Sequence, residues 1–121
     1  MMISKINIQD NFMRIHDYFN PRISGELNDS YVKMVKIKGE FIWHHHDHED
    51  EMFFVWKGRL LIRLRDGEIA VNEGEFVIIP KGIEHQPIAE DEVHLLLIEP
   101  KTTLNTGNIV NERTVSIPQR I

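Results

Sequence analysis

The sequence predicts an all-β protein, an antiparallel β-sandwich or β-barrel preceded by a short N-terminal arm or helix. Two observations predict this fold class. From residue 31 onward the chain consists of short segments rich in β-branched and apolar residues, with Gly or Pro at most of the divisions. Several segments alternate polar and apolar residues, which is the period of a strand with one buried face. Short strands at regular spacing with such turns are typical of antiparallel sandwiches and barrels.

The length of 121 residues is that of one domain, and no internal repeat or linker divides it. Near the N-terminus, Phe12, Ile15 and Phe19 stand at helical spacing, and an Asn-Pro pair directly after them would end a helix. We therefore predict three parts. They are an N-terminal arm over residues 1–30, a barrel over residues 31–100, and a C-terminal tail over residues 101–121 that packs on the barrel.

Seven strands are expected in the barrel. They cover residues 31–38, 41–46, 51–57, 59–65, 68–72, 75–80 and 93–100. The fourth is the clearest, because its apolar and basic residues alternate, and an Asp-Gly hairpin signal follows it directly. Its inward face is expected to hold Leu60, Ile62 and Leu64, and its outward face Arg59, Arg63 and Arg65.

Composition excludes several classes of function. The net charge of -5 argues against nucleic-acid binding, which needs a basic surface to displace counterions. Lys33, Lys36 and Lys38 alternate with apolar residues and are interpreted as the solvated face of a strand. No run of 18 apolar residues is present, so a membrane span is not expected. The absence of cysteine excludes disulfides and thiolate sites, and it favours a cytoplasmic location.

The most unusual stretch is HHHDHEDE, which begins at His44. Successive side chains of a strand point to opposite sides, so His44 and His46 share one face and His45 lies on the other. Glu51 begins the next strand and can reach back across the turn toward the two histidines. Further along, His85 follows a Pro-Lys-Gly turn where another strand begins. Two histidines that share one strand face form a natural two-point clamp for a metal ion.

The spacing of these residues resembles the two motifs of the cupin family. The first motif is similar to Gly39, four residues, His44-x-His46, four residues, Glu51, six residues and Gly58. The second is similar to Gly74, five residues, Pro80-x-Gly82, two residues and His85. There are two departures. Four residues instead of the usual five separate Gly39 from His44, and Ala89 replaces an asparagine that often ends the second motif.

The resemblance implies a small single-domain cupin, a jelly-roll-like barrel of six or eight strands. It further implies that His44, His46, Glu51 and His85 hold one divalent transition metal ion, Fe, Mn, Ni, Co or Zn, inside the barrel. Four protein ligands on an octahedral ion would leave two positions free for a substrate or dioxygen. The alternative is a barrel that keeps a polar pocket and holds no metal.

Other polar residues near the motifs have plainer interpretations. His45 is expected to point outward, and His48 to lie in solvent in the connecting turn. Asp47, Glu49 and Asp50 are interpreted as turn residues that keep the loop soluble. His94 lies on the last strand, and it either supports the site or faces a substrate, or it is an ordinary core or rim histidine. His16 has no assigned role.

Four large apolar residues fall on the strand face opposite the candidate ligands. They are Trp43, Met52, Phe54 and Trp56. A contiguous apolar patch of this kind is rarely left in water. Either the N-terminal arm or a second subunit is expected to cover it. Since small cupins commonly dimerise, we predict a homodimer whose interface includes part of this surface.

The predicted function is that of a metal-dependent enzyme that acts on a small polar metabolite in the lumen, the interior of the barrel. The alternative is a non-catalytic barrel that binds a small molecule or is only structural. Most inferred lumen positions are apolar, and neither a second catalytic group nor a basic cluster for a phosphate is visible. These inward positions are Phe53, Val55, Leu60, Ile62 and Leu64. The reaction is not determined by these residues, because one fold hosts many functions.

Overall fold

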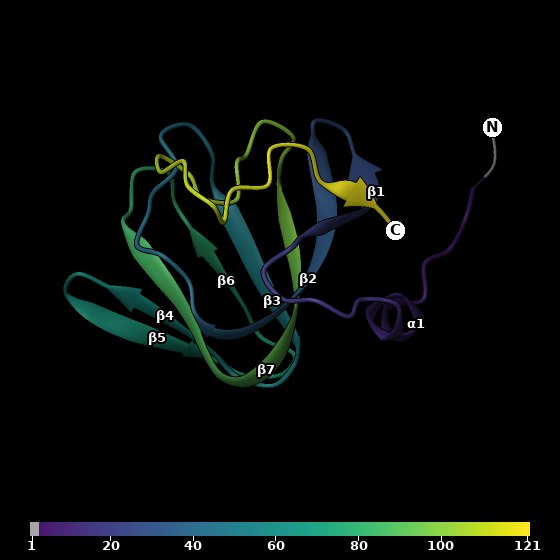
Figure 1. The fold of residues 1–121 in the computed structure, drawn as a ribbon, viewed down its shortest axis with the longest axis horizontal. Coiled ribbons are helices and arrows are strands. Elements are labelled where there is room, and N and C mark those ends of the chain that lie inside the picture. Colours follow the sequence, from purple (N-terminus) through teal and green to yellow (C-terminus); the bar gives the residue numbers. More distant parts are fainter. Residues whose placement is uncertain (1–2) are drawn as a thin grey trace.

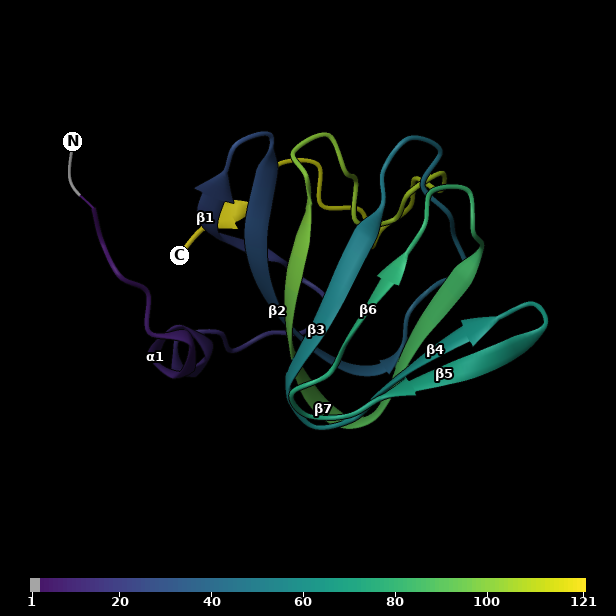
Figure 2. The same cartoon turned by 180° about the vertical axis from the view of Figure 1, so that it is seen from behind.

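A computed structural model describes residues 3–121 of the chain (Figures 1 and 2). One helix and eight strands follow each other along these residues. They are α1 (Ile8–Met13), β1 (Arg22–Leu27), β2 (Ser30–Glu40), β3 (Glu51–Lys57), β4 (Leu60–Leu64), β5 (Gly67–Val71), β6 (Phe76–Ile79), β7 (His85–Pro100) and β8 (Gln119–Arg120). The predicted all-β fold with a short N-terminal arm or helix is confirmed, and the N-terminal element is a helix. Within residues 3–121, no helix is long and apolar enough to cross a membrane.

The longest strand, β7, joins two layers of the fold (Figure 1). Its first residues pair with β4, and its later residues pair with β3, while β2 pairs with both parts on the other side. Between these parts, residues 90–92 of β7 stand opposite Lys38 alone, which is a bulge of the ladder. A bulge bends a strand and increases its twist, so β7 passes from one layer to the other.

The sheet is mixed. The pairs among β2 to β7 are antiparallel, and β1 pairs antiparallel with β2, but the short β8 pairs in parallel with β1. The prediction of a wholly antiparallel sheet is therefore corrected at this edge. Both β1 and β8 lie in segments where no strand was expected. Neither is strongly alternating in burial, and β8 has only two residues, so periodicity gave no signal for them.

The hydrophobic core fills the space between the layers. Its members come from the inward positions of β2, β3, β4 and β7, together with one residue each from β5 and β6. They include Val35, Ile37, Phe53, Val55, Leu60, Ile62, Val71, Ile79, Leu95 and Leu97. The inward positions predicted for β3 and β4 are confirmed, although Leu64 is only partly buried, and the three arginines around β4 are exposed. The alternation follows because successive side chains of a strand point to opposite sides.

Residues 41–46 do not form the predicted strand. Phe41 donates its N–H to the carbonyl of Pro87, and the only ladder bridge in this segment joins His44 to His85. Proline has no N–H, so Pro87 cannot return a hydrogen bond and a regular ladder cannot continue past it. The predicted alternation holds for the three histidines, because His44 and His46 are buried and His45 is partly exposed, but it fails at the start of the segment, where Phe41 is buried.

The helix is shorter than the pattern suggested. It spans Ile8–Met13, and its first turn is capped by Asn7, whose side chain accepts a hydrogen bond from the N–H of Asp10. Phe12 and Ile15 pack against Met34 on the outer face of β2, as helical spacing allows. Phe19 leaves this face and adopts a left-handed backbone conformation with a φ of 58°. The helix therefore covers one end of the sheet, outside the barrel (Figure 2).

Candidate metal centre

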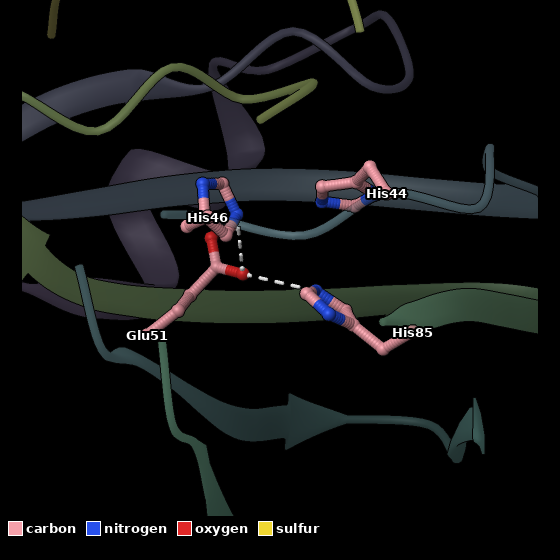
Figure 3. Close-up of side chains that lie close together, drawn as sticks. All are labelled: His44, His46, Glu51 and His85. Carbon is pink, nitrogen blue, oxygen red and sulfur yellow. Dashed lines mark ion pairs between the residues drawn. The ribbon is translucent and has the colours of Figure 1, made fainter. Parts of the chain in front are cut away.

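The four predicted ligands meet at one end of the lumen (Figure 3). His44 and His85 come from segments that exchange two backbone hydrogen bonds, with N–O distances of 3.1 and 2.9 Å. His46 follows two residues later, and its carbonyl accepts the N–H of Gly82. Glu51 is the first residue of β3. All four side chains are buried, and one ligand atom from each lies within 4.8 Å of the others.

The carboxylate of Glu51 stands at the centre of this four-residue group. Its Oε1 atom lies 3.4 Å from His46 Nε2 and 3.5 Å from His85 Nε2 (Figure 3). These separations are long for hydrogen bonds, and each of the three atoms lacks a hydrogen-bond partner among residues 3–121. Atoms that ligate one zinc-sized ion at about 2.1 Å lie roughly 3.0–3.4 Å apart. The two Glu51–histidine separations are close to this range, and the chemistry of the four residues suits a divalent metal ion.

Two of the histidines are fixed in one orientation by the backbone. His44 Nδ1 lies 3.0 Å from the carbonyl of Ile42, and His85 Nδ1 lies 2.9 Å from the carbonyl of Ile83. A carbonyl only accepts, so each Nδ1 carries the proton and each Nε2 keeps its lone pair for the centre. Such support is common behind metal-ligating histidines.

Burial and neighbouring charges set the ionisation of the group. Burial, helped by the nearby His85, lowers the pKa of His44 to about 4. Burial works against the ionised form of Glu51, but the neighbouring Glu99, His46 and His85 side chains outweigh it and hold the pKa of Glu51 well below its usual range. At neutral pH the group therefore offers a neutral His44 and an ionised Glu51, the forms that bind a metal ion.

A cavity opens onto this centre. It has about 470 Å³ of space, including its open end, and both His44 and Glu51 line it. Most of its wall is apolar and comes from β2, β3, β7 and the segment before β1. The apolar lining residues are Phe19, Pro21, Val35, Ile37, Phe41, Phe53, Pro87, Leu95 and Leu97. A small molecule that enters the cavity meets the four-residue group at its polar end.

Comparison with known proteins agrees with this geometry. The family profile of the cupin domain matches residues 31–99, which is more than half of the chain. The chain belongs to the cupin family. A cupin-2 domain protein from Shewanella frigidimarina has a similar structure with a TM-score of 0.78 and 44% sequence identity, over 79% of this chain and 94% of that chain. A Neisseria meningitidis protein is similar with a TM-score of 0.75 and 29% identity, over 81% of this cupin and 100% of that chain.

Two sequence relatives match this cupin over only part of their own length. The uncharacterized protein YdbB of Bacillus subtilis is 44% identical over 62 residues, which are 50% of this chain and 55% of that protein. A protein of Saccharolobus solfataricus named "Putative dioxygenase" is 30% identical over 89 residues, which are 70% of this chain and 23% of that protein. The matched region thus spans about half of one relative and about a quarter of the other.

The structure does not bring His94 to the centre. The lumen face of β7 holds the odd-numbered residues such as Leu95 and Leu97, and His94 points to the outer face. There it stacks on Phe12 of α1 with ring centroids 4.8 Å apart, and its Nε2 lies 2.7 Å from Glu92 Oε2. The interpretation of His94 as a supporting or substrate-facing residue is therefore corrected. Both faces of this strand are apolar, so alternation alone did not distinguish them.

The other histidines lie outside the four-residue group. His45 is partly exposed, and its Nε2 lies 2.9 Å from Asp47 Oδ1. His48 and His16 are exposed. Their positions agree with the plainer interpretations of His45 and His48, and His16 has no partner among the side-chain hydrogen bonds of residues 3–121.

Sequence reasoning missed a buried ion pair in the lumen of this cupin. Lys33 Nζ donates a hydrogen bond of 2.8 Å to Glu99 Oε1, and both side chains are almost completely buried. The interpretation of Lys33 as part of a solvated face is therefore wrong, whereas Lys38 is exposed as expected. A signal was present, because Lys33 shares its strand face with Val35 and Ile37.

The C-terminal tail packs against the first motif. The N–H of Asn108 donates to the carbonyl of His45, and the Asn108 side chain accepts the N–H of His45. Gly107 lies so close that a Cβ atom there would be 2.2 Å from the His45 carbonyl oxygen and 2.9 Å from His44 Cδ2. The tail crosses this end of the barrel (Figure 1), and Asn105 lines the cavity. It therefore supports the segment that carries two of the candidate ligands.

Proposed function

We propose that this cupin binds one divalent transition metal ion through His44, His46, Glu51 and His85. We further propose that it is a metal-dependent enzyme for a small polar metabolite. One observation carries the proposal. Three buried ligand atoms without hydrogen-bond partners converge at separations of 3.4 and 3.5 Å. Buried polar groups without partners are rare and destabilising in native proteins, and a shared metal ion would satisfy all three.

The geometry around the centre supports a role for a bound small molecule. When present, the ion supplies Lewis-acid chemistry, or redox chemistry if it is a metal such as iron. His44 and Glu51 line the cavity, so the polar end of a ligand would meet the ion while its remaining atoms contact apolar walls. These walls exclude water and strengthen electrostatic interactions at the centre.

The alternative is a barrel that binds a metal and a small molecule without turnover, or that is only structural. The composition of the cavity favours this alternative to some degree, because Asn105 and Glu99 are the only lining polar residues outside the four-residue group. The name "Putative dioxygenase" of one relative makes dioxygen consumption the first reaction to assay with iron-loaded protein. Consumption of dioxygen with a candidate metabolite would favour the enzyme, and binding without consumption the alternative.

Elemental analysis of the purified, untagged protein tests metal binding. The wild type is compared with a His44→Ala/His46→Ala double variant, both as purified and after reconstitution with divalent ions. We expect near-stoichiometric metal in the wild type and none in the folded variant. Absence of metal in both proteins after reconstitution would contradict the proposal.

We also propose that the protein is a homodimer. Its supporting feature is an apolar patch on the outer face of β3 and β6, where Phe76 and Ile78 are more than half exposed. In register with them lie Phe54 and Met52 of β3, which are partly buried. The helix α1 covers only the neighbouring end, near Trp56 and Leu96. A second subunit would remove the remaining apolar surface from water.

A further inference from the structure

The lumen contains an ion pair that the four-residue group does not include. Lys33 on β2 and Glu99 on β7 are each 2% exposed, and Lys33 Nζ lies 2.8 Å from Glu99 Oε1. On these paired strands Lys33 is opposite Leu97, so Glu99 is its diagonal neighbour on the same face. The pair is therefore fixed by the register of the sheet as well as by its own contact.

Glu99 also lies beside the metal-centre carboxylate on the lumen side of the sheet. Strand β7 lies between β2 and β3. Met52 of β3 pairs with Ile98 of β7, and the strands are antiparallel. The same register, continued by one residue, brings Glu51 opposite Glu99. Both carboxyl groups line the same cavity, and Glu99 Oε2 has no hydrogen-bond partner among residues 3–121. Glu99 thus stands in the middle of three adjacent strands, held by Lys33 on one side and with Glu51 beside it on the other.

The ion pair is difficult to explain as a device for stability. Removing two charges from water is costly, and replacing a buried ion pair by apolar residues of similar volume is often neutral or stabilising. The neighbouring lumen positions on the same strands are Val35 and Leu97, both buried in the core. An apolar pair would continue that core. The position beside Glu51 gives the pair a different role.

We propose that Glu99 and Lys33 are positioning residues for Glu51. Lys33 holds Glu99, and Glu99 holds the carboxylate of Glu51 in the orientation in which its Oε1 faces His46 and His85. The pair thereby increases the affinity of the four-residue group for a divalent metal ion. This inference rests on the proposed metal binding, and it deepens it by naming two residues outside the ligand set.

The test measures the dissociation constants of Zn²⁺ and of Mn²⁺, each added alone to metal-free protein in competition with a fluorescent chelator. The main variant is Lys33→Met/Glu99→Leu, which removes both polar side chains of the pair. Its matched control is Lys38→Met/Glu90→Leu, which makes the same change at exposed positions of the same two strands. Thermal unfolding of each metal-free protein is measured in parallel.

A third variant, Glu99→Gln, tests orientation directly. Its amide oxygen can accept the hydrogen bond from Lys33, and its NH₂ group can donate to Glu51, so residue 99 keeps an acceptor and a donor without the carboxyl group. We expect Lys33→Met/Glu99→Leu to unfold at or above the wild-type temperature and to bind both ions roughly 10–100-fold more weakly. Glu99→Gln should bind them with an affinity closer to that of the wild type, and the exposed control should match the wild type.

Several results would overturn the proposal. One is wild-type affinity in Lys33→Met/Glu99→Leu, and another is an equal loss of affinity in the exposed control. An equal loss of metal affinity in Glu99→Gln and in Lys33→Met/Glu99→Leu would show that the hydrogen-bonding groups of residue 99 do not set the orientation of Glu51. Failure of the double variant to fold would show that the pair serves the fold instead. If the wild type itself binds neither ion, the proposed function fails, and this inference fails with it.

Discussion

His44 and His85 exchange both of their backbone hydrogen bonds, with N–O distances of 2.9 and 3.1 Å, although they belong to two separate motifs. Their imidazole rings lie with centroids 4.4 Å apart. The two motifs are thus joined through the main chain, independently of any side-chain ligand. A site of this kind is assembled by folding of the barrel, so loss of one ligand side chain should reduce metal affinity without unfolding the protein.

Metal binding should therefore stabilise the folded protein in proportion to occupancy. At a free ion concentration of 100 times the dissociation constant, the free energy of unfolding should rise by about 2.7 kcal/mol. The Tm of the wild type should rise by several degrees on addition of Zn²⁺ or Mn²⁺ to chelator-treated protein. Differential scanning calorimetry with and without the ion measures this shift.

Glu51→Gln is the matched variant for this measurement, since it preserves the shape of the side chain and removes the ionised carboxylate. It should fold but show little or no rise in Tm on addition of the same ion. A wild-type Tm that does not respond to any of the five candidate ions would contradict the prediction. A shift of equal size in Glu51→Gln would exclude Glu51 as a ligand.

The contribution of His44 to the stability of the metal-free protein should decrease as the pH falls from about 6.5 to about 4. His44 has a pKa lowered from 6.5 to about 4 by burial and by His85. Between these values the unfolded chain binds more protons than the folded protein, so stability rises with pH in this window and is complete above it. The effect amounts to about 3 kcal/mol for His44. Urea unfolding at several pH values in the presence of a chelator measures it.

His44→Gln separates this effect from other titrating groups. It should reduce the loss of stability between about pH 6.5 and 4. Glu51 contributes at lower pH, because its pKa is well below 4.5 and its stabilisation is lost only as the pH falls through that lower value. A His16→Gln control, at an exposed position, should leave the profile unchanged. Identical pH profiles for the wild type and His44→Gln would show that His44 is not responsible.

The candidate site was predictable from the sequence because its signals are local. In a strand or an extended segment, alternation places His44 and His46 on one side, and the spacing of the second motif adds His85. This result did not require residues 41–46 to be a regular strand, and they are not one. Extended backbone with intermittent pairing gives the same alternation as a full ladder.

Longer-range features were not predictable in the same way. The position of Glu99 beside Glu51 depends on the register between β7 and β3, which no residue pattern specifies. The sequence left two interpretations of His94 open for a related reason, because β7 is apolar on both faces, and packing against α1 favours the ordinary core or rim histidine. Lys33 is different. Lys33 lies on the same strand face as Val35 and Ile37, which indicates a buried position. It was nevertheless interpreted as solvated, because most lysines are.

The tail gives a prediction about the geometry of the first motif. Gly107 has a φ of +57°, and a Cβ atom at this position would lie 2.2 Å from the carbonyl oxygen of His45. Gly107→Ala should therefore destabilise the protein by about 1–3 kcal/mol, because both the backbone conformation and the contact are unfavourable for alanine. The free energy of unfolding from urea titration measures the change. Gly67→Ala, where a Cβ atom meets open space, should change stability by no more than about 0.5 kcal/mol.

The apolar patch on β3 and β6 gives the last prediction, which concerns the proposed homodimer. Phe76 and Ile78 are 59% and 53% exposed, and they extend the rows formed by Phe54 and Met52. If a second subunit covers this patch, Phe76→Ser/Ile78→Ser should convert a dimer into a monomer, because the apolar surface no longer favours association. Light scattering coupled to size-exclusion chromatography gives the mass of each protein. Ile117→Ser, at an 88% exposed position outside the patch, should leave the mass unchanged, and a wild type that is already a monomer would contradict the proposal.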